Sequence, residues 1–434
     1  MVVFGGNTRR ETLVEMNKAG INPEILVWAR LSAGFSEEEA AQKLGLKDTA
    51  KQSAIEKLEL LETGEKQPTR SQLAKIATAY SRPLLTFYLN APPAEGRKGE
   101  DFRQTASSIS KRENAMLDVL RRDVRARQEM VRSIIEDDDE PVERRFVGSA
   151  RIAQGVSNTV QSMAQTLEFN HTDVTVRRGD PATLFRLLRT KAESSGVFVL
   201  MLGDLGSWHS AIPAEVFRGF AISDPLAPFV VLNTNDAVAA RSFTLIHELA
   251  HLWLGQSGVS GAPSIDTPSN SHAQIEQFCN DVAGEFLLPD ELFWNGVQRF
   301  EPTNLAAAGT AIATIAQRWS VSEPMVAYRL RRRNEISSDV YQSLYSQYLA
   351  RWQAAKAKEK AERKDEVKLP DLTKKKFRLG SGLLEFVHRT VRDNGMTYTK
   401  AAKVLGTKPG AVEPLLKKFE SSNGSFFSAT EGRI

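Results

Sequence analysis

The sequence predicts an α+β protein that is mostly helical and has a small mixed sheet in its middle part. Helical patterns separated by turn residues occupy residues 23–90 and 303–350. Between them, short runs of β-branched and aromatic residues lie at 171–233, and two long helical patterns follow. Strands grouped together, with helices before and after them, are typical of the α+β class.

Composition sets the general class of protein. The 434 residues are enough for roughly three domains. Hydrophobic residues make up 41% and charged residues 25%, as in ordinary globular proteins. The single cysteine, Cys279, excludes an internal disulfide and fits a reducing compartment. Apolar stretches such as Val197–Leu202 are too short to span a bilayer, and residues 1–10 lack the apolar core of a signal peptide. We therefore expect a cytoplasmic protein without membrane contact.

The chain divides into five predicted segments. A helical domain at 1–90 is followed by a linker and helical connector at 91–150, a core at 151–300, a helical extension at 301–350, and a basic linker with a small helical unit at 351–434. The last segment has 19 Lys and Arg against 10 Asp and Glu, whereas the remaining residues are net acidic. A basic tail can contact nucleic acid or an acidic protein, or it can simply be solvated.

The core alternates strands and helices in a defined order. A helix is expected at Pro181–Ser195, between the first two of four strands. The strands are predicted at Val174–Arg178, Gly196–Leu202, Phe217–Ser223 and Phe229–Asn233.

Two long helices complete the predicted core. The first runs from about Asp236 to Leu254, capped by Thr234 or Asn235. A Ser-, Gly- and Pro-rich loop, Gln256–Ser271, leads to the second helix, Ala273–Leu288.

The first of these helices carries the motif His247-Glu248-Leu249-Ala250-His251. Residues four apart lie on one helix face, so both imidazoles can reach one Zn²⁺. Glu248 lies beside them, where it can take a proton from a metal-activated water. The alternative is a pair of histidines on a helix surface, but apolar neighbours on the other faces indicate a buried helix.

A catalytic zinc site needs a third protein ligand and an open position. Ser257 stands where a third histidine six residues further on would lie, so the ligand must come from elsewhere. A carboxylate from the second helix, the gluzincin-type arrangement, is the remaining source, with Glu276 the best candidate and Asp281 and Glu285 as alternatives. Asn280 could hydrogen-bond a ligand.

Other residues near the motif have weaker assignments. We expect Cys279 to pack in an apolar face rather than bind metal. A donor that stabilises the developing oxyanion could be His209, His272 or Tyr328. The predicted strand Phe217–Ser223 could bind an extended substrate at its edge.

These segments resemble the core of the ImmA/IrrE family of zinc metallopeptidases. The resemblance covers residues 150–350 and rests on five stretches: Phe217–Ala221, Ala227–Asn233, Phe243–His251, Ile275–Asn280 and Phe286–Pro289. In that family the glutamate at the position of Glu276 is the third ligand. The resemblance implies a zincin-like core and a zinc endopeptidase that cleaves one protein partner. Such partners are repressor- or antitoxin-like and belong to stress response, toxin–antitoxin control or phage defence.

The N-terminal segment resembles an XRE-type helix-turn-helix domain. Phe35–Leu46 matches its scaffold helix and turn, and Leu58–Gly64 and Gln72–Tyr80 match the helices that follow. The expected reading helix, Ala54–Glu62, is acidic, although DNA contact needs Lys, Arg, Asn or Gln. The candidate DNA-contacting residues are Lys47, Lys51, Gln52, Lys57 and Arg70.

Two readings of the whole chain follow from these resemblances. In the first, the chain is a zinc peptidase, and its N-terminal helices bind DNA, form a homodimer or present a protein partner. In the second, it is a DNA-binding regulator or antitoxin whose zinc core is structural or a docking module. Two further segments, Ile315–Arg333 and Thr397–Leu416, resemble helix-turn-helix remnants that could pack, recognise substrate or contact DNA.

Overall fold

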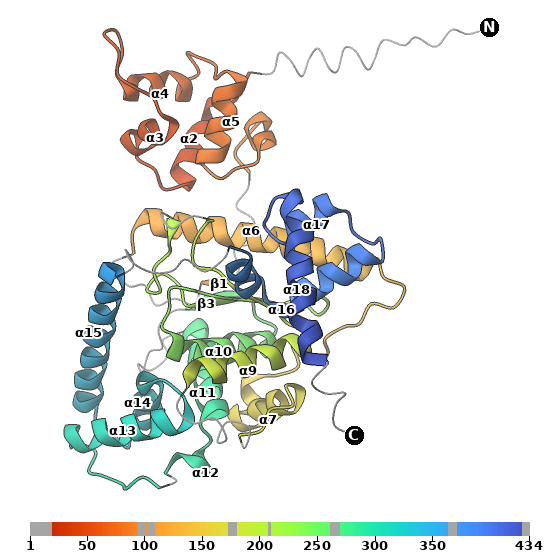
Figure 1. Ribbon diagram of the computed structural model, residues 1–434. Helices are drawn as coiled ribbons and strands as arrows, with labels where there is room; N and C mark the ends of the chain where they lie inside the picture. Colours follow the sequence, from red (N-terminus) through yellow and green to blue (C-terminus); the bar gives the residue numbers. More distant parts are fainter. Residues whose placement is uncertain are drawn as a thin grey trace. The chain divides into compact units, whose positions relative to one another are not determined.

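The structure is a computed structural model that describes residues 20–93, 100–101, 109–171, 180–206, 210–260, 270–294, 296–362 and 371–427. The chain forms two compact units. The first comprises Met1–Lys98 and Ser108–Arg121, and the second comprises Gly99–Ser107 and Arg122–Ile434 (Figure 1). Helix α6 (Lys111–Glu136) contributes residues to both. Of the helices described, none has the length and apolar character needed to cross a membrane.

The first unit is built from short helices whose starts are fixed by local sequence. They are α2 (Pro23–Ser32), α3 (Glu37–Leu44), α4 (Ala54–Glu62), α5 (Arg70–Ala79) and the 3₁₀ helix η1 (Leu84–Tyr88). Ser36, Ser53 and Thr69 each accept a hydrogen bond from a backbone amide in the first turn of the next helix. In each case the side chain three residues later bonds back to the capping residue, which fixes the helix start.

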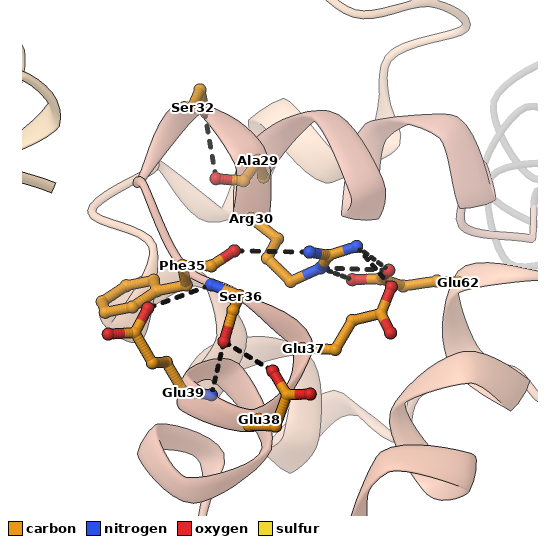
Figure 2. Close-up of polar contacts among 9 residues, drawn as sticks. All are labelled: Ala29, Arg30, Ser32, Phe35, Ser36, Glu37, Glu38, Glu39 and Glu62. Carbon is orange, nitrogen blue, oxygen red and sulfur yellow. Dashed lines mark hydrogen bonds and ion pairs between the residues drawn. The ribbon is translucent and has the colours of Figure 1, made fainter. Parts of the chain in front are cut away.

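A buried arginine joins three of these helices (Figure 2). Arg30 of α2 donates from Nε and Nη2 to the Glu62 carboxylate of α4 over 2.8 and 2.9 Å, and from Nη2 to Glu37 of α3 over 3.3 Å. The side chains of Arg30 and Glu62 are only 8% and 9% exposed. Glu62 therefore faces the interior. The acidic sequence pattern of the predicted reading helix had suggested a surface charge at this position.

The second unit contains a mixed sheet with the strand order β1-β5-β3-β4-β2. Strand β2 pairs with β4 in parallel, and β3 lies between β4 and β5 and is antiparallel to both. Strand β1 runs parallel to β5. The strands are β1 (Glu100–Asp101), β2 (Phe198–Met201), β3 (Gly219–Ile222), β4 (Phe229–Leu232) and β5 (Gly258–Ser260). A small mixed sheet among many helices confirms the α+β class.

Helices α9 (Pro181–Ser194) and α10 (Arg241–Leu254) pack on this sheet, and α11 (Ser271–Leu287) packs on α10 (Figure 1). Their apolar residues form one core with the sheet. The remaining described helices of the unit are α7 (Val156–Thr166), α12 (Asp290–Phe293), α13 (Leu305–Trp319), α14 (Glu323–Arg332), α15 (Ser338–Glu362), α16 (Asp371–Arg392), α17 (Tyr398–Val404) and α18 (Val412–Phe427), with 3₁₀ turns at Ile152–Gln154, Val238–Ala240 and Pro409–Ala411.

Two segments predicted without strands contain them. Strand β5 lies within the segment predicted as the loop Gln256–Ser271, and β1 lies within the predicted linker and helical connector at 91–150. Both strands are too short to have an alternating pattern of their own, and they exist through pairing with neighbours. The predicted strand Val174–Arg178 lies outside the described residues. The other three predicted strands of the core are present with shorter bounds.

Helix α10 begins later than predicted. It starts at Arg241 without a side-chain cap, rather than near Asp236 with Thr234 or Asn235 as its cap. The amide of Asn235 instead donates to the backbone carbonyls of Gly203 and Ile212 over 2.8 and 3.0 Å. Asn235 therefore fixes loops beside the sheet and is not available to the helix.

A buried ion pair fastens the C-terminal helices to the sheet. Arg189 and Glu193 of α9 bond at 3.0 Å, and Arg189 also donates to the carbonyls of Val199 in β2 and Phe377 in α16. Gly380 interrupts α16 with φ +79, and a Cβ added there would lie 2.8 Å from the Val199 carbonyl oxygen and 2.1 Å from Glu193. Only glycine fits this position without strain.

We predict that Gly380→Ala destabilises the second unit by about 1–3 kcal/mol, because the alanine combines an unfavourable φ with a steric clash. The matched control is Gly410→Ala, since a Cβ at Gly410 has nothing within 4 Å. Chemical denaturation of both variants measures the difference. Equal stabilities would contradict the proposed close contact.

Candidate metal centre

Helix α10 is almost completely enclosed by the core. Leu245, Ile246, Leu249, Leu252 and Trp253 are fully buried on the faces that pack against neighbouring elements. The helix ends at Gly255, whose φ of 71 closes the C-terminus in the left-handed conformation. This packing fixes the rotation of the helix about its axis and therefore the direction of the two histidines of the motif.

The structure brings His247, His251 and Glu276 together. The Nε2 atoms of the two histidines lie 3.1 Å apart. The Glu276 carboxylate of α11 lies 2.9 Å from His251 Nε2 through Oε1 and 3.5 Å from His247 Nε2 through Oε2. The two histidines are 3% and 0% exposed, and the side chain of Glu276 is 15% exposed. Three donor atoms from two helices therefore converge in a nearly dry site.

The chemistry of this donor set fits a divalent metal. Two imidazole nitrogens and a carboxylate are the protein ligands of many catalytic zinc sites. A neutral imidazole nitrogen is either a donor or an acceptor, so two facing Nε2 atoms need a shared proton or a shared cation between them. Burial alone would raise the pKa of Glu276, but the two histidines outweigh burial and lower this pKa to about 2. The carboxylate is therefore ionised and ready to bind a cation.

Glu248 lies beside the three donors and is 0% exposed. Burial raises the pKa of Glu248 to about 8, while the His247 imidazole and the Ser260 hydroxyl act in the opposite direction. A bound divalent cation would also favour the charged form. A carboxyl group whose pKa lies near neutrality can both accept and release a proton.

Glu248 packs against the backbone of strand β3. A Cβ added to Gly219 would lie 2.6 Å from Glu248 Oε1 and 2.8 Å from its Cγ. The absence of a side chain at Gly219 thus leaves the space that the Glu248 carboxylate occupies. A glycine inside a strand often marks such a close approach, so Gly219 carried a signal that the sequence analysis did not use.

Strand β5 adds a polar side chain that the sequence analysis missed. Ser260 Oγ lies 3.0 Å from His247 Nε2 and 3.3 Å from His251 Nε2, and Ser260 is 1% exposed. The residue lies in a segment predicted as a loop, and no spacing rule connects it with the motif. Its place follows from the register of β5 beside β3, in which Ser260 is opposite Gly219.

The remaining predicted site residues have varied positions. Asn280 is buried next to His247 and hydrogen-bonds to it. Burial lowers the pKa of His247, but Glu276, Glu248 and the hydrogen bond with Asn280 outweigh burial and raise this pKa. His272 is exposed in the first turn of α11, and His209 lies outside the described residues. The Tyr328 hydroxyl is buried and donates to Asp281 over 3.0 Å.

The two alternative carboxylates are bound to arginines of α14. Asp281 accepts from Arg332 over 2.6 Å, and Glu285 accepts from Arg329 over 2.6 Å. These ion pairs fasten α14 to α11, and neither carboxylate belongs to the His247, His251 and Glu276 cluster. Cys279 is fully buried, and burial raises the pKa of its thiol well above the usual value, as expected for a packing residue.

Strand β3 cannot bind an extended substrate at its edge. It is paired with β4 on one side and with β5 on the other, so it has no open edge. A pocket nearby is lined by Phe243, one turn before His247 on α10, together with Arg218, Tyr328, Tyr341 and Tyr345 and neighbouring residues. It provides an aromatic surface next to the site.

Two comparisons with known proteins cover the region that contains this centre. Residues 206–331 match a peptidase family, the IrrE N-terminal-like domain. The chain is also similar to the radiation response metalloprotease IrrE of Deinococcus deserti, at 32% identity over 112 residues. The similar region covers 25% of this chain and 38% of that relative, so the chain spans well under half of the relative's length. The two similarities support a metallopeptidase domain of the ImmA/IrrE type in this region.

We predict that Gly219→Ala costs at least about 1 kcal/mol of stability, because the new Cβ displaces the Glu248 carboxylate. In a Glu248→Ala background the same substitution should cost much less, since the group it meets is gone. The control is Gly309→Ala in helix α13, whose Cβ would meet only Leu344 at 3.8 Å. Denaturation of the four members of the cycle gives the coupling, and additive costs would contradict the close approach.

Proposed function

We propose that the chain is a zinc-dependent endopeptidase in which His247, His251 and Glu276 hold the metal and Glu248 is the general base. The observation that supports this most directly is the convergence of three donor atoms from α10 and α11 beside a fully buried carboxylate. A purely structural metal site has no use for such a carboxylate. The similarity of residues 206–331 to a peptidase family supports the same reaction class.

The residues around the centre have distinct parts in peptide hydrolysis. Zinc held by His247, His251 and Glu276 would supply a Lewis acid for the scissile carbonyl and would lower the pKa of a nearby water. Glu248 takes the proton from the attacking water at its carboxylate and passes it to the leaving amine. Asn280 holds His247 in place, and the apolar packing of α10 excludes bulk water from the site.

The proposed substrate is one protein partner rather than proteins in general. Similarity to a protein named a radiation response metalloprotease supports a part in a bacterial stress response. A repressor- or antitoxin-like partner, and a setting in toxin–antitoxin control or phage defence, follow from the resemblance of the core to the ImmA/IrrE family. The aromatic pocket beside Phe243 is a suitable place for an apolar substrate side chain.

We predict about one zinc per wild-type chain and clear loss of zinc in His247→Ala and Glu276→Ala. Glu248→Gln should keep its zinc, since Glu248 is not a ligand. Glu285→Gln is the control for a carboxylate on α11 outside the centre. Elemental analysis of protein purified without added metal measures the content, and full zinc in Glu276→Ala would refute the ligand assignment.

Activity is tested with the same variants. Host extract is incubated with wild type or with Glu248→Gln, and new peptide termini are identified by mass spectrometry. The proposal expects termini that appear only with wild type and come from one or a few proteins. Identical termini in both samples, or no zinc in wild type after zinc is supplied, would refute a peptidase function.

The N-terminal unit is proposed to be an XRE-type helix-turn-helix domain. Support comes from the order and lengths of α2 to α5 and from the capped start of α4, the expected reading helix. Lys47, Lys51 and Gln52 are exposed in the loop before α4, and Arg70 is exposed at the start of α5. Lys57 differs, because its ammonium donates to the Lys47 carbonyl over 2.6 Å. The exposed cations favour a second function, contact with DNA phosphates.

Salt dependence separates the two functions. If the chain acts only as a peptidase, its affinity for a DNA duplex should change little with salt concentration. A DNA-binding regulator would show a steep logarithmic slope, of about −0.9 for each phosphate contacted. Lys47→Ala and Lys51→Ala should then each reduce that slope by roughly one, whereas Arg186→Ala, at an exposed position of α9, should not. Fluorescence anisotropy at several salt concentrations makes the measurement.

A further inference from the structure

Ser260 lies at the candidate metal centre, although neither the motif nor the predicted ligand set includes it. Its hydroxyl oxygen is 3.0 Å from His247 Nε2 and 3.3 Å from His251 Nε2. These two nitrogens are the same atoms that face each other and the Glu276 carboxylate. The Ser260 hydroxyl therefore faces the point on which the three predicted ligands converge.

The distances from Ser260 to the two histidines are close to the ligand–ligand spacing of a zinc site. Four ligands at about 2.1 Å from one zinc ion lie about 3.4 Å from one another. The two histidine nitrogens are 3.1 Å apart, and Glu276 lies 2.9 and 3.5 Å from them. Ser260 Oγ lies 3.0 and 3.3 Å from the same nitrogens. The serine oxygen thus lies at ligand spacing from both histidine nitrogens.

Several groups surround the Ser260 hydroxyl. It faces two imidazole nitrogens and also interacts with the Glu248 carboxylate, and its single proton can be donated to only one of the three. The two imidazole nitrogens also face each other. One cation between Ser260 and the three predicted ligands satisfies their inward lone pairs together.

The backbone of β5 holds Ser260 in this position. Ser260 is opposite Gly219 in the register with β3, and its carbonyl accepts a hydrogen bond from Arg218 over 3.2 Å. The residue is 1% exposed, so bulk water does not reach the hydroxyl. A serine fixed in this way can bind a cation at little entropic cost, since its rotamer is already limited by packing.

We propose that Ser260 is the fourth ligand of the metal in the free protein, an inference that rests on the proposed zinc site. The serine oxygen fills the position that a catalytic centre keeps open for water or substrate. The resting centre is therefore closed, and an incoming water, carbonyl or inhibitor group displaces the hydroxyl. Because a neutral hydroxyl is a weaker ligand than a carboxylate or an imidazole, it is the group most easily displaced.

The test uses full-length protein with Co²⁺ in place of zinc. Ser260→Cys puts a thiol at the proposed corner, and a thiolate bound to Co²⁺ gives an intense charge-transfer absorption that oxygen and nitrogen ligands lack. Ser257→Cys is the matched control on the same segment, since its hydroxyl accepts from the Ser223 amide instead. Wild type controls for the native Cys279.

The expected result is the charge-transfer band in Ser260→Cys alone. Ser260→Ala should also weaken zinc binding by about tenfold in a chelator competition, within the range known for groups that support a metal ligand set. In the same variant, acetohydroxamate should bind the cobalt protein several-fold more tightly than in wild type, because there is no hydroxyl to displace.

The outcomes distinguish this inference from the proposed function. If Co²⁺ binds wild type and Ser260→Cys but the band is absent, the serine is not a ligand and the peptidase proposal stands. If acetohydroxamate binds wild type and Ser260→Ala equally, the closed resting centre is refuted. If wild type binds neither Co²⁺ nor zinc, the proposed metal site fails, and the Ser260 proposal fails with it.

Discussion

The burial of helix α10 is the constraint on which the centre depends. Ten consecutive residues, Thr244–Trp253, are buried, and they include both histidines and a glutamate. Burying three ionisable groups on one helix is costly unless each finds a partner. The partners of the two histidines come from α11 and from strand β5, so the helix, the second helix and the sheet must assemble together for the site to exist. Folding of this unit and formation of the centre are therefore coupled.

The sheet contributes to the centre in two ways: a glycine on one strand leaves space, and a serine on the neighbouring strand supplies a hydroxyl. Strand β3 lacks a side chain at Gly219, and this space holds the Glu248 carboxylate. Strand β5 supplies Ser260 directly opposite. One pair of residues facing each other across two strands thus defines both the position of the proposed base and the position of the hydroxyl that lies within 3.3 Å of both histidines. Helical geometry alone would specify neither.

Much of this site could be predicted from sequence, and the reasons are physical. The spacing of His247 and His251 places them on one helix face, and the helix periodicity is strong enough to be recognised from a single chain. Glu276 can be predicted as the third ligand because it lies on the next helix along the chain. Ser260 and strand β5 could not be predicted, because three residues in a loop-like segment carry no periodicity and depend on tertiary pairing.

The acidic pattern of α4 was also partly misleading, since Glu62 forms a buried pair with Arg30. The start of α10 was misplaced because Asn235 bonds to loops rather than to the helix.

The C-terminal helix α16 packs on strand β2 at the outer edge of the sheet. Strand β2 is its last strand, and the carbonyls of Val197 and Val199 lie on the side away from β4. Arg189 donates to one of these carbonyls, and the backbone at Gly380 and Gly382 lies close to both. An unprotected strand of this kind, with the apolar sequence of β2, is a template on which another chain can add a strand and begin to aggregate. The described part of the C-terminal segment therefore protects the protein from self-association through this edge, and a truncated form that ends before Gly380 would lose that protection.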